Sequence, residues 1–268
     1  MKWGKTFLVV FAAVVITALG IDAADTIQGN EGTLLSQVIS RKSDQVCPAG
    51  MTEVFNIPNI TCVDIYEASP NQACPIQNPE QMVGTITNVD SPGCGVESKK
   101  DVLPWRFITR DQAMQMCARV SKRIPTSEEW YALSLGMSAV EASCNVSTKQ
   151  ISRTGAQSSC ISPHGAYDLV GNVWEWVSDD VINGIYKSNP VPDSGYIAQV
   201  DAEGMPTVVT DSPGALFGSD YFWSKREGAY GIIRGGYYDS GTDGGIYTLH
   251  AGTVPTTASI GIGFRCVK

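Results

Sequence analysis

The stretch GAYDLVGNVWEW at residues 165–176 constrains the fold of this chain more than any other. It combines an acid, a Gly-Asn turn and a second acid held between two tryptophans. Gly171 can adopt a positive φ that a residue with a Cβ resists, so Asp168 and Glu175 can turn inward together with the carbonyl oxygens between them. Hard cations such as Ca²⁺ prefer such a mixed cage of carboxylate and carbonyl oxygens. The alternative is a buried turn whose tryptophans fill the core and whose acids accept hydrogen bonds from nearby amides.

The cysteines indicate how the chain is braced and in which compartment it folds. They are even in number and include no C-x-x-C pair, which favours disulfides over a metal cluster and hence an oxidising environment. Three pairs of sequence neighbours each enclose one polar loop, and the first pair also encloses a strand-turn-strand unit. Eight cysteines can pair in many ways. If each cysteine pairs with its neighbour in the sequence, the three bridges are Cys47–Cys62, Cys74–Cys94 and Cys144–Cys160.

The N-terminus has the layout of an export signal. Lys2 and Lys5 precede an apolar run over residues 7–19, and small residues follow. Residues 1–24 are therefore predicted to be a signal peptide, with an uncleaved N-terminal anchor as the alternative. Residues 25–44 read as a linker, and residues 45–268 as one domain. We expect an exported protein that is secreted, at the cell surface or periplasmic.

The formal net charge of −8 limits the partners. Nucleic-acid binders need a basic face to neutralise phosphates, so a nucleic-acid partner is not expected. An anionic membrane surface would also repel the chain, which leaves membrane contact only through an uncleaved N-terminal segment. With His164 and His250 as the only histidines, a histidine-based zinc or iron centre is not expected.

Two helices are predicted from capping boxes, Thr109 with Gln112 and Thr126 with Glu129. The first continues into an apolar stripe at i, i+3, i+4 and i+7, and the second ends at Gly136. The rest of the chain is expected to be strands and loops. Residues 71–100 and 181–225 are expected to be long loops, and three strands are expected at 231–238, 245–251 and 262–267.

Three further segments accompany the 165–176 stretch, in the order CVDIYE at 62–67, KRIPTSEEW at 122–130, and RGG at 234–236 followed by GIGFRC at 261–266. Together the four segments resemble the formylglycine-generating enzyme family, whose sulfatase-modifying factor domain is a variant of the C-type lectin fold. The resemblance implies an α+β, C-type lectin-like fold with two helices packed on small antiparallel sheets and long disulfide-braced loops.

The resemblance also implies two features of the interior. The family places a disulfide between the first helix and the last strand, which supports pairing of Cys117 with Cys266. It also has a calcium site whose positions match Asp168, Glu175 and the main-chain oxygens of Gly171 and Val173. A structural Ca²⁺ ion is therefore expected at those four residues.

The family's oxidase activity is not expected. Two active-site cysteines, five residues apart, follow the Arg-Gly-Gly motif in the enzymes and bind copper as thiolates. The matching positions are Ser240 and Gly245, which supply no thiolate, so no copper is expected. The chain also contains no serine-histidine-aspartate arrangement, phosphate-binding loop or H-E-x-x-H motif that suggests another active site.

The segment that replaces the catalytic one resembles the variable region of diversity-generating retroelement proteins, which use this fold as a scaffold. It is rich in Tyr, Asp, Ser, Thr and Gly, a mixture that is also used in antibody binding surfaces. On that template Leu249, Pro255 and residues 262–265 are framework. The residues expected to face a ligand are Tyr237, Tyr238, Asp239, Ser240, Asp243, Tyr247, His250, Gly252, Thr253, Thr257 and Ser259. The alternative is that this ligand-facing set consists of ordinary loop and strand residues, with Tyr237 and Tyr247 packed inside.

Three functions compete on these grounds. The first is an exported, non-enzymatic protein that binds a protein or glycan ligand through its C-terminal surface, which is hypervariable if the second resemblance holds. The second is an oxidase of the formylglycine-generating type, or a divergent relative, that acts on a protein cysteine. The third is a structural component of a cell or virion surface.

Overall fold

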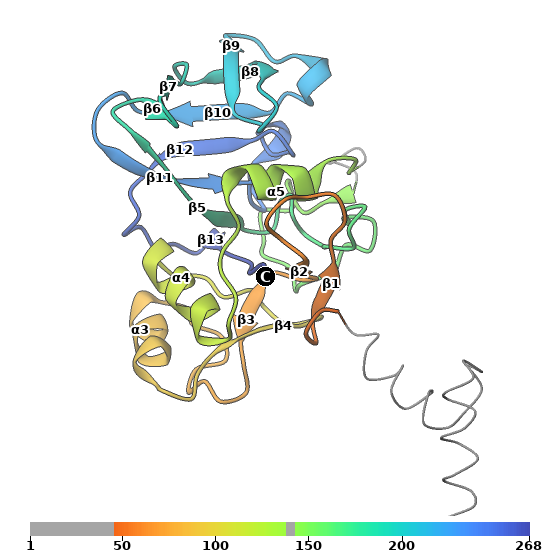
Figure 1. Ribbon diagram of the computed structural model, residues 1–268, viewed down its shortest axis with the longest axis vertical. Helices are drawn as coiled ribbons and strands as arrows, with labels where there is room; N and C mark the ends of the chain where they lie inside the picture. The colour runs from red at the N-terminus through yellow and green to blue at the C-terminus, as the bar shows by residue number, and fades with distance from the viewer. Residues whose placement is uncertain (1–45, 138–142) are drawn as a thin grey trace, which may run out of the picture. The chain divides into compact units, whose positions relative to one another are not determined.

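The computed structural model describes residues 46–137 and 143–268 (Figure 1). The expected signal peptide and linker lie outside the described residues. No helix in the described ranges is long and apolar enough to cross a membrane. The chain from residue 49 to residue 268 forms one compact unit.

Two short antiparallel ladders begin the domain. Strand β1 (Met51–Glu53) pairs with β2 (Cys62–Asp64), so the second strand of the unit begins at Cys62 and not inside the loop that Cys47 and Cys62 were expected to enclose. Strand β3 (Ala68–Pro70) pairs with β4 (Val96–Ser98). The end of the chain closes on the first ladder, because the amide nitrogen of Cys62 donates to the carbonyl oxygen of Lys268 over 3.0 Å. Both termini of the domain are thereby tied together by backbone hydrogen bonds.

Both predicted helices are present with their capping boxes. Helix α4 (Arg110–Arg119) begins after Thr109, and α5 (Ser127–Ser134) begins after Thr126. In each, the N-cap side chain accepts from the third helical amide and the third side chain accepts from the N-cap amide. Ala113, Met116 and Cys117 of the apolar stripe of α4 are buried, as their spacing predicts, whereas Val120 is the half-buried C-cap.

A third helix, α3 (Met82–Asp90), lies in the segment expected to be a loop. No side chain caps its N-terminus, and its Gly and β-branched residues are weak helix formers. Tertiary contacts hold it instead. Thr85 accepts from the Trp105 indole over 3.0 Å, and Asn88 exchanges hydrogen bonds with the backbone of Ile76.

The main sheet is larger than expected and of mixed direction. It has nine strands, with β13 paired beside β5 and the others in the order β7-β6-β5-β11-β12-β10-β8-β9. Figure 1 shows β5, β11, β12, β10, β8 and β9 in this order from the middle of the domain to its top. Most pairs are antiparallel, but β10 runs parallel to β12 and β13 runs parallel to β5. The strands are β5 (Trp174–Ile182), β6 (Ile185–Tyr186), β7 (Asn189–Pro190), β8 (Gly195–Val200), β9 (Pro206–Thr210), β10 (Tyr221–Ser224), β11 (Ala229–Arg234), β12 (Leu249–Thr253) and β13 (Ile262–Gly263).

The expectation of long loops at residues 181–225 is therefore wrong. This region supplies five of the strands, β6 to β10, together with a short 3-10 helix, η1 (Ala215–Phe217). Its many Gly, Pro, Asp and Ser residues occupy the turns between these short strands. The three C-terminal strands are present, although each is shorter than predicted.

Hydrophobic residues are buried in separate clusters on the two faces of the sheet. Trp130 and Leu133 of α5 pack with Phe222 and Ile232 in the first cluster. Residues of α4 pack with Trp176 and Phe264 in the second. Neighbouring side chains of a strand point to opposite faces, which is why Ile232 and its neighbour Ile233 enter different clusters.

Disulfides brace the domain. The structure contains the bridges Cys74–Cys94, Cys117–Cys266 and Cys144–Cys160, each as expected from the sequence. Cys47 and Cys62 are disulfide-bonded as well. The Cys117–Cys266 bridge joins α4 to the C-terminus across 149 residues and lies in the second hydrophobic cluster.

Candidate functional site

The carboxylate of Glu175 is the centre of a buried polar network. Its two oxygens accept from the guanidinium of Arg265 at 2.6–2.9 Å, and Oε2 also accepts from the indole nitrogen of Trp130 at 2.7 Å. Neither the Glu175 nor the Arg265 side chain is exposed to solvent. The acid between the two tryptophans therefore serves to anchor the C-terminal GFR segment and helix α5 onto β5.

Two more carboxylates surround this ion pair. Asp168 accepts from the Gly155 amide over 2.6 Å, and Glu67 accepts from the Asn172 side chain over 2.7 Å. Burial raises the pKa of Asp168 to about 6, against the opposing effects of the Gly155 amide and Arg265. Burial, with the added repulsion of Asp168 and Glu175, raises the pKa of Glu67 well above its usual value.

The expected calcium ligands lie in this network, but their side chains do not fit a calcium ion as they stand. A carboxylate offers about four acceptor positions, and the four hydrogen bonds from Arg265 and Trp130 use those of Glu175. Asp168 gives one oxygen to the Gly155 amide. The side chains thus follow the alternative interpretation of the motif, in which the acids accept hydrogen bonds. These hydrogen bonds do not support the calcium prediction, and its direct test is the melting temperature in CaCl₂ and in EDTA.

The positions that match the copper-binding cysteines serve the backbone instead. The Ser240 hydroxyl accepts from the Tyr237 amide over 2.9 Å, just before the short 3-10 helix η2 (Gly241–Asp243). Gly245 is buried against Asp220, and a Cβ at this position would collide with the Asp220 carboxylate. Asp220 in turn accepts from the Tyr247 amide over 2.7 Å and from the Thr248 amide over 3.1 Å. This loop is closed by its own contacts, and the packing at Gly245 leaves no space for a thiol at that position.

The most prominent feature of the C-terminal face is a continuous row of aromatic side chains, which we call the aromatic strip. Neighbouring rings along it have centroids 4.7–6.5 Å apart. All of its members are half-buried except Trp174, which is 8% exposed. The strip consists of Tyr196, Tyr221, Trp223, His250, Trp174, Tyr237 and Tyr238.

Strand register explains why these rings meet. Tyr221 of β10 is paired with Tyr196 of β8, and Trp223 of β10 is paired with His250 of β12. Side chains of paired residues lie on the same face of a sheet, about 5 Å apart. Phe222, between the two β10 aromatics, points to the opposite face and is fully buried in the cluster with α5. The strip therefore lies on the α4 side of the sheet, where Trp223 and Tyr237 also border the second hydrophobic cluster.

His250 is a neutral member of the strip. Burial, with a contribution from the charge of Lys225, lowers its pKa to about 4. Its Nδ1 accepts from the Gly252 amide over 3.2 Å and lies 2.9 Å from the Thr253 hydroxyl. In the neutral ring the proton is then on Nε2, so His250 carries a hydrogen-bond donor at that atom while its ring stacks on Trp223.

The structure brings together only some of the residues predicted to face a ligand. Tyr237, Tyr238 and His250 belong to the strip, and Thr253 contacts His250. Tyr247 lies apart, with its ring against Tyr131 and Phe217 next to the first hydrophobic cluster.

The remaining predicted residues differ in exposure and in role. Asp239 is exposed, and Asp243 is half-buried with its carbonyl oxygen accepting from Thr248. Gly252 is buried, and Thr257 and Ser259 make turn hydrogen bonds. The expected framework residues Leu249 and Phe264 are fully buried, whereas Pro255 is half-buried.

Sequence reasoning missed four members of the strip. Trp174 was interpreted only as a core residue, and Tyr196, Tyr221 and Trp223 lie in the segment predicted to be loops. One signal was available. In Tyr221-Phe222-Trp223, three consecutive aromatics are typical of a strand, and a strand puts the first and third on one face.

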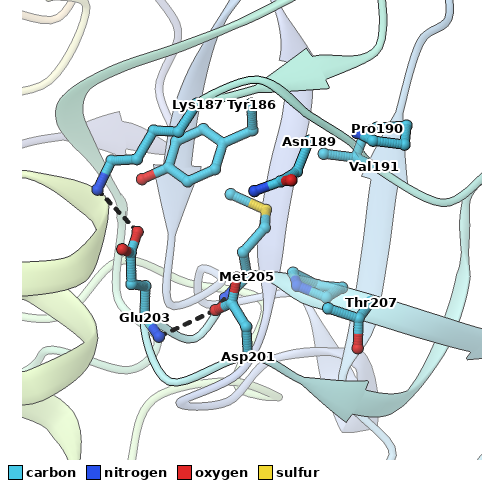
Figure 2. A pocket seen from close by; sticks show the side chains of 10 residues that line it. Tyr186, Lys187, Asn189, Pro190, Val191, Asp201, Glu203, Met205 and Thr207 are labelled. Atoms are coloured by element: carbon cyan, nitrogen blue, oxygen red, sulfur yellow. Dashed lines mark hydrogen bonds and ion pairs between the residues drawn. The ribbon is translucent and has the colours of Figure 1, made fainter.

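A small pocket lies elsewhere on the domain, between the β6–β7 hairpin on one side and the β8–β9 turn with the start of β9 on the other (Figure 2). Its volume of about 180 Å³ is below the ~300–1,000 Å³ of most ligand sites. Its charged groups are also paired: Lys187 lies 2.7 Å from Glu203, and Asp201 accepts from the Glu203 and Met205 amides at 2.9 Å. Figure 2 shows the Met205 side chain directed into the space between Tyr186 and Asn189. This pocket is a weaker candidate than the strip.

Comparison with known proteins identifies one matching family and several similar folds. The family described as "Sulfatase-modifying factor enzyme 1-like domain" matches residues 86–268, more than half of the chain. Among solved structures, the Major Tropism Determinant I1 Variant is 17% identical with a TM-score of 0.49, over 83% of this chain and 53% of that chain. Treponema denticola variable protein 1 is 14% identical with a TM-score of 0.40, over 65% and 72%. CarF is 14% identical with a TM-score of 0.41, over 77% and 85%.

The chain thus spans about half the length of the Major Tropism Determinant chains it matches. Among curated proteins the comparison found no match.

Proposed function

Because the chain belongs to the sulfatase-modifying factor enzyme 1-like domain family, we propose that it keeps the fold of that family and uses it as an exported, non-enzymatic scaffold for binding a ligand. The ligand surface is the C-terminal face, centred on Tyr237, Tyr238 and His250. The aromatic strip is the observation that carries this proposal.

The strip has the physical properties of a binding surface. Aromatic rings supply a large contact area and lose little conformational entropy when they are immobilised, and Tyr and Trp are among the residues that contribute most to binding energy. Here the rings are already held in contact with one another, as with the Tyr237 and Tyr238 rings at 4.9 Å. Preorganised side chains reduce the entropic cost of association.

The oxidase is the second candidate, and two observations argue against it. Ser240 and Gly245 stand where the enzymes have copper-binding cysteines, and Gly245 is packed so closely against Asp220 that even a Cβ does not fit. The test is incubation of the purified chain with copper and a sulfatase peptide, followed by mass spectrometry. We expect the peptide cysteine to be unchanged, and its conversion to formylglycine would overturn the proposal.

The DNA that flanks the gene can show whether the ligand surface is hypervariable. We propose that the segment encoding residues 237–265 has a near-copy beside the gene, next to a reverse transcriptase, with differences concentrated at adenines. Sequencing of the flanking DNA decides this point. A locus without such a copy would leave a binding protein whose surface is fixed.

A further inference from the structure

We propose that the aromatic strip binds a linear, neutral oligosaccharide, whose sugar rings pack against the exposed parts of the aromatic side chains along it. The ligand surface then extends beyond the C-terminal segment to Tyr196, Tyr221 and Trp223. This inference rests on the proposed function and names its ligand class.

The length and continuity of the strip favour an extended ligand. Contacts run without a gap from Tyr196 through Tyr221 to Trp223, at 5.0 and 4.7 Å, and from Trp223 to Trp174 at 5.7 Å. Trp174 then stacks on Tyr237 at 6.5 Å, and Tyr238 completes the row. A compact ligand contacts two or three such rings, whereas a chain of sugars uses the whole row.

The chemistry of the rings matches the apolar faces of sugars. The face of an aromatic ring is electron-rich, so it attracts C–H groups that carry a partial positive charge, and pyranose rings present such C–H groups on their flat sides. Trp223 and His250 lie near the middle of the strip with their ring planes 19° apart. The hydroxyls of Tyr221 and Tyr238 have no hydrogen-bond partner in residues 46–137 and 143–268, and His250 offers its Nε2 donor. These groups are available for sugar hydroxyls.

Charge favours a neutral ligand. No member of the strip carries a charge at neutral pH, since the pKa of His250 is lowered to about 4 by burial and by Lys225. The Arg106 guanidinium, which interacts electrostatically with Tyr238, is itself buried and donates to Asn78. The chain as a whole carries a formal charge of −8. An anionic polysaccharide would therefore meet net repulsion, which the single charge of the exposed Lys225 beside His250 offsets only in part.

Ring spacing argues against a proline-rich peptide, the other extended ligand that docks on aromatic grooves. A polyproline helix rises about 3.1 Å per residue with three residues per turn, so equivalent side chains recur about every 9 Å. Neighbouring rings of the strip have centroids only 4.7–6.5 Å apart and form a continuous aromatic surface, without separate side-chain pockets about 9 Å apart.

The test is isothermal titration of the full domain with cellohexaose, laminarihexaose, chitohexaose and mannohexaose. We expect at least one hexasaccharide to bind with a Kd of about 1 mM or tighter, and its disaccharide to bind at least about tenfold more weakly because it spans fewer rings. Trp223→Ala and Tyr196→Ala are each expected to weaken binding about tenfold. Phe55→Ala is the matched control, because Phe55 is an aromatic residue that is 61% exposed and lies outside the strip. Melting curves verify that each variant is folded.

The outcomes separate this inference from the proposed function. If no hexasaccharide binds at millimolar concentration, the neutral glycan is wrong, and a protein ligand becomes the occupant to pursue. If a hexasaccharide binds and Tyr238→Ala abolishes binding while Trp223→Ala and Tyr196→Ala do not, the C-terminal face binds ligand but the extended strip is wrong. If binding is the same in all of these variants, both proposals fail.

Discussion

Arg265 and Glu175 form a fully buried ion pair, 2.6 Å apart at its closest atoms, that joins the end of the chain to the central strand β5. Burial alone would lower the pKa of Arg265. The nearby carboxylates of Glu175, Glu67 and Asp168 instead raise this pKa above its usual value. Three carboxylates therefore depend on one guanidinium for their charge balance.

This arrangement predicts an asymmetry between two substitutions. Arg265→Met leaves three buried carboxylates without a cation and should lower the free energy of unfolding by about 3–5 kcal/mol. Glu175→Gln should cost less, because Arg265 keeps Glu67 and Asp168 nearby. Urea unfolding at neutral pH compares the two variants. Equal losses would mean that the carboxylates are not coupled through Arg265.

The hydrogen bonds between Arg265 and Glu175 also bear on the calcium prediction. Because Arg265 and Trp130 use the oxygens of Glu175, we expect the melting temperature to be the same in millimolar CaCl₂ and in EDTA. A ligand that binds only the folded state raises the melting temperature in proportion to the logarithm of its concentration. A rise with Ca²⁺ that is lost in Asp168→Ala would instead establish the calcium site implied by the family resemblance.

A contact in this network was predictable from the sequence only where its two residues are close together along the chain. The 165–176 stretch predicted that both acids turn inward, because a local pattern fixes local conformation. It did not predict that Glu175 pairs with Arg265, which lies 90 residues away, since nothing in a sequence specifies which cation a buried acid meets. The capping boxes of α4 and α5 were predictable for the same local reason.

Helix α3 and strand β10 were missed because tertiary contacts override their local signals. The segment around Thr85 lacks a capping residue, and its contact with Trp105 is visible only in the folded chain. Strand β10 is short and lies between turn-rich segments, so its aromatic pattern was outweighed by the surrounding Gly, Ser and Asp. As a result, the C-terminal half of the candidate surface was predicted and the half on β8 and β10 was not.

Asp220 should make stability depend on pH. Burial raises the pKa of Asp220 to about 7, against the lowering effect of hydrogen bonds from Tyr247 and Thr248. A pKa that is higher in the folded state contributes stability below the unfolded value of 3.8, and this contribution is lost as pH rises through about 7. Wild type should therefore lose stability relative to Asp220→Asn between pH 4 and pH 7. Urea titrations across this range measure the difference, and the exposed residue Asp211, changed to Asn, serves as the control. A constant difference between wild type and Asp220→Asn would contradict the prediction.

The Cys117–Cys266 bridge should contribute more stability than Cys74–Cys94. The sequence separations are 149 and 20 residues, and the cost of closing a loop in the unfolded chain grows with its length. Replacing both cysteines of the longer loop by alanine should lower the free energy of unfolding by roughly 2 kcal/mol more than the same change in the shorter loop. Denaturant unfolding of the two double variants measures this. A larger loss for the Cys74–Cys94 variant would mean that native packing, and not chain entropy, sets the contribution.

The framework and the ligand surface should respond differently to truncation. Leu249 and Phe264 are fully buried, so replacing either by alanine should cost about 2–5 kcal/mol and lower the melting temperature. Tyr238 is half-buried and Asp239 is exposed, so alanine at these positions should leave the melting temperature nearly unchanged. Thermal unfolding of the four variants tests the assignment. Unfolding of the Tyr238 variant would identify that residue as part of the core.

The most direct test of ligand binding through the C-terminal face is an array that carries neutral oligosaccharides and purified bacterial surface proteins. Wild type, Tyr238→Ala and Phe55→Ala are applied at equal concentration, and their binding is compared spot by spot. The account predicts at least one bound spot whose signal falls about tenfold in Tyr238→Ala and is unchanged in Phe55→Ala. Binding that Tyr238→Ala leaves intact at every spot would contradict it.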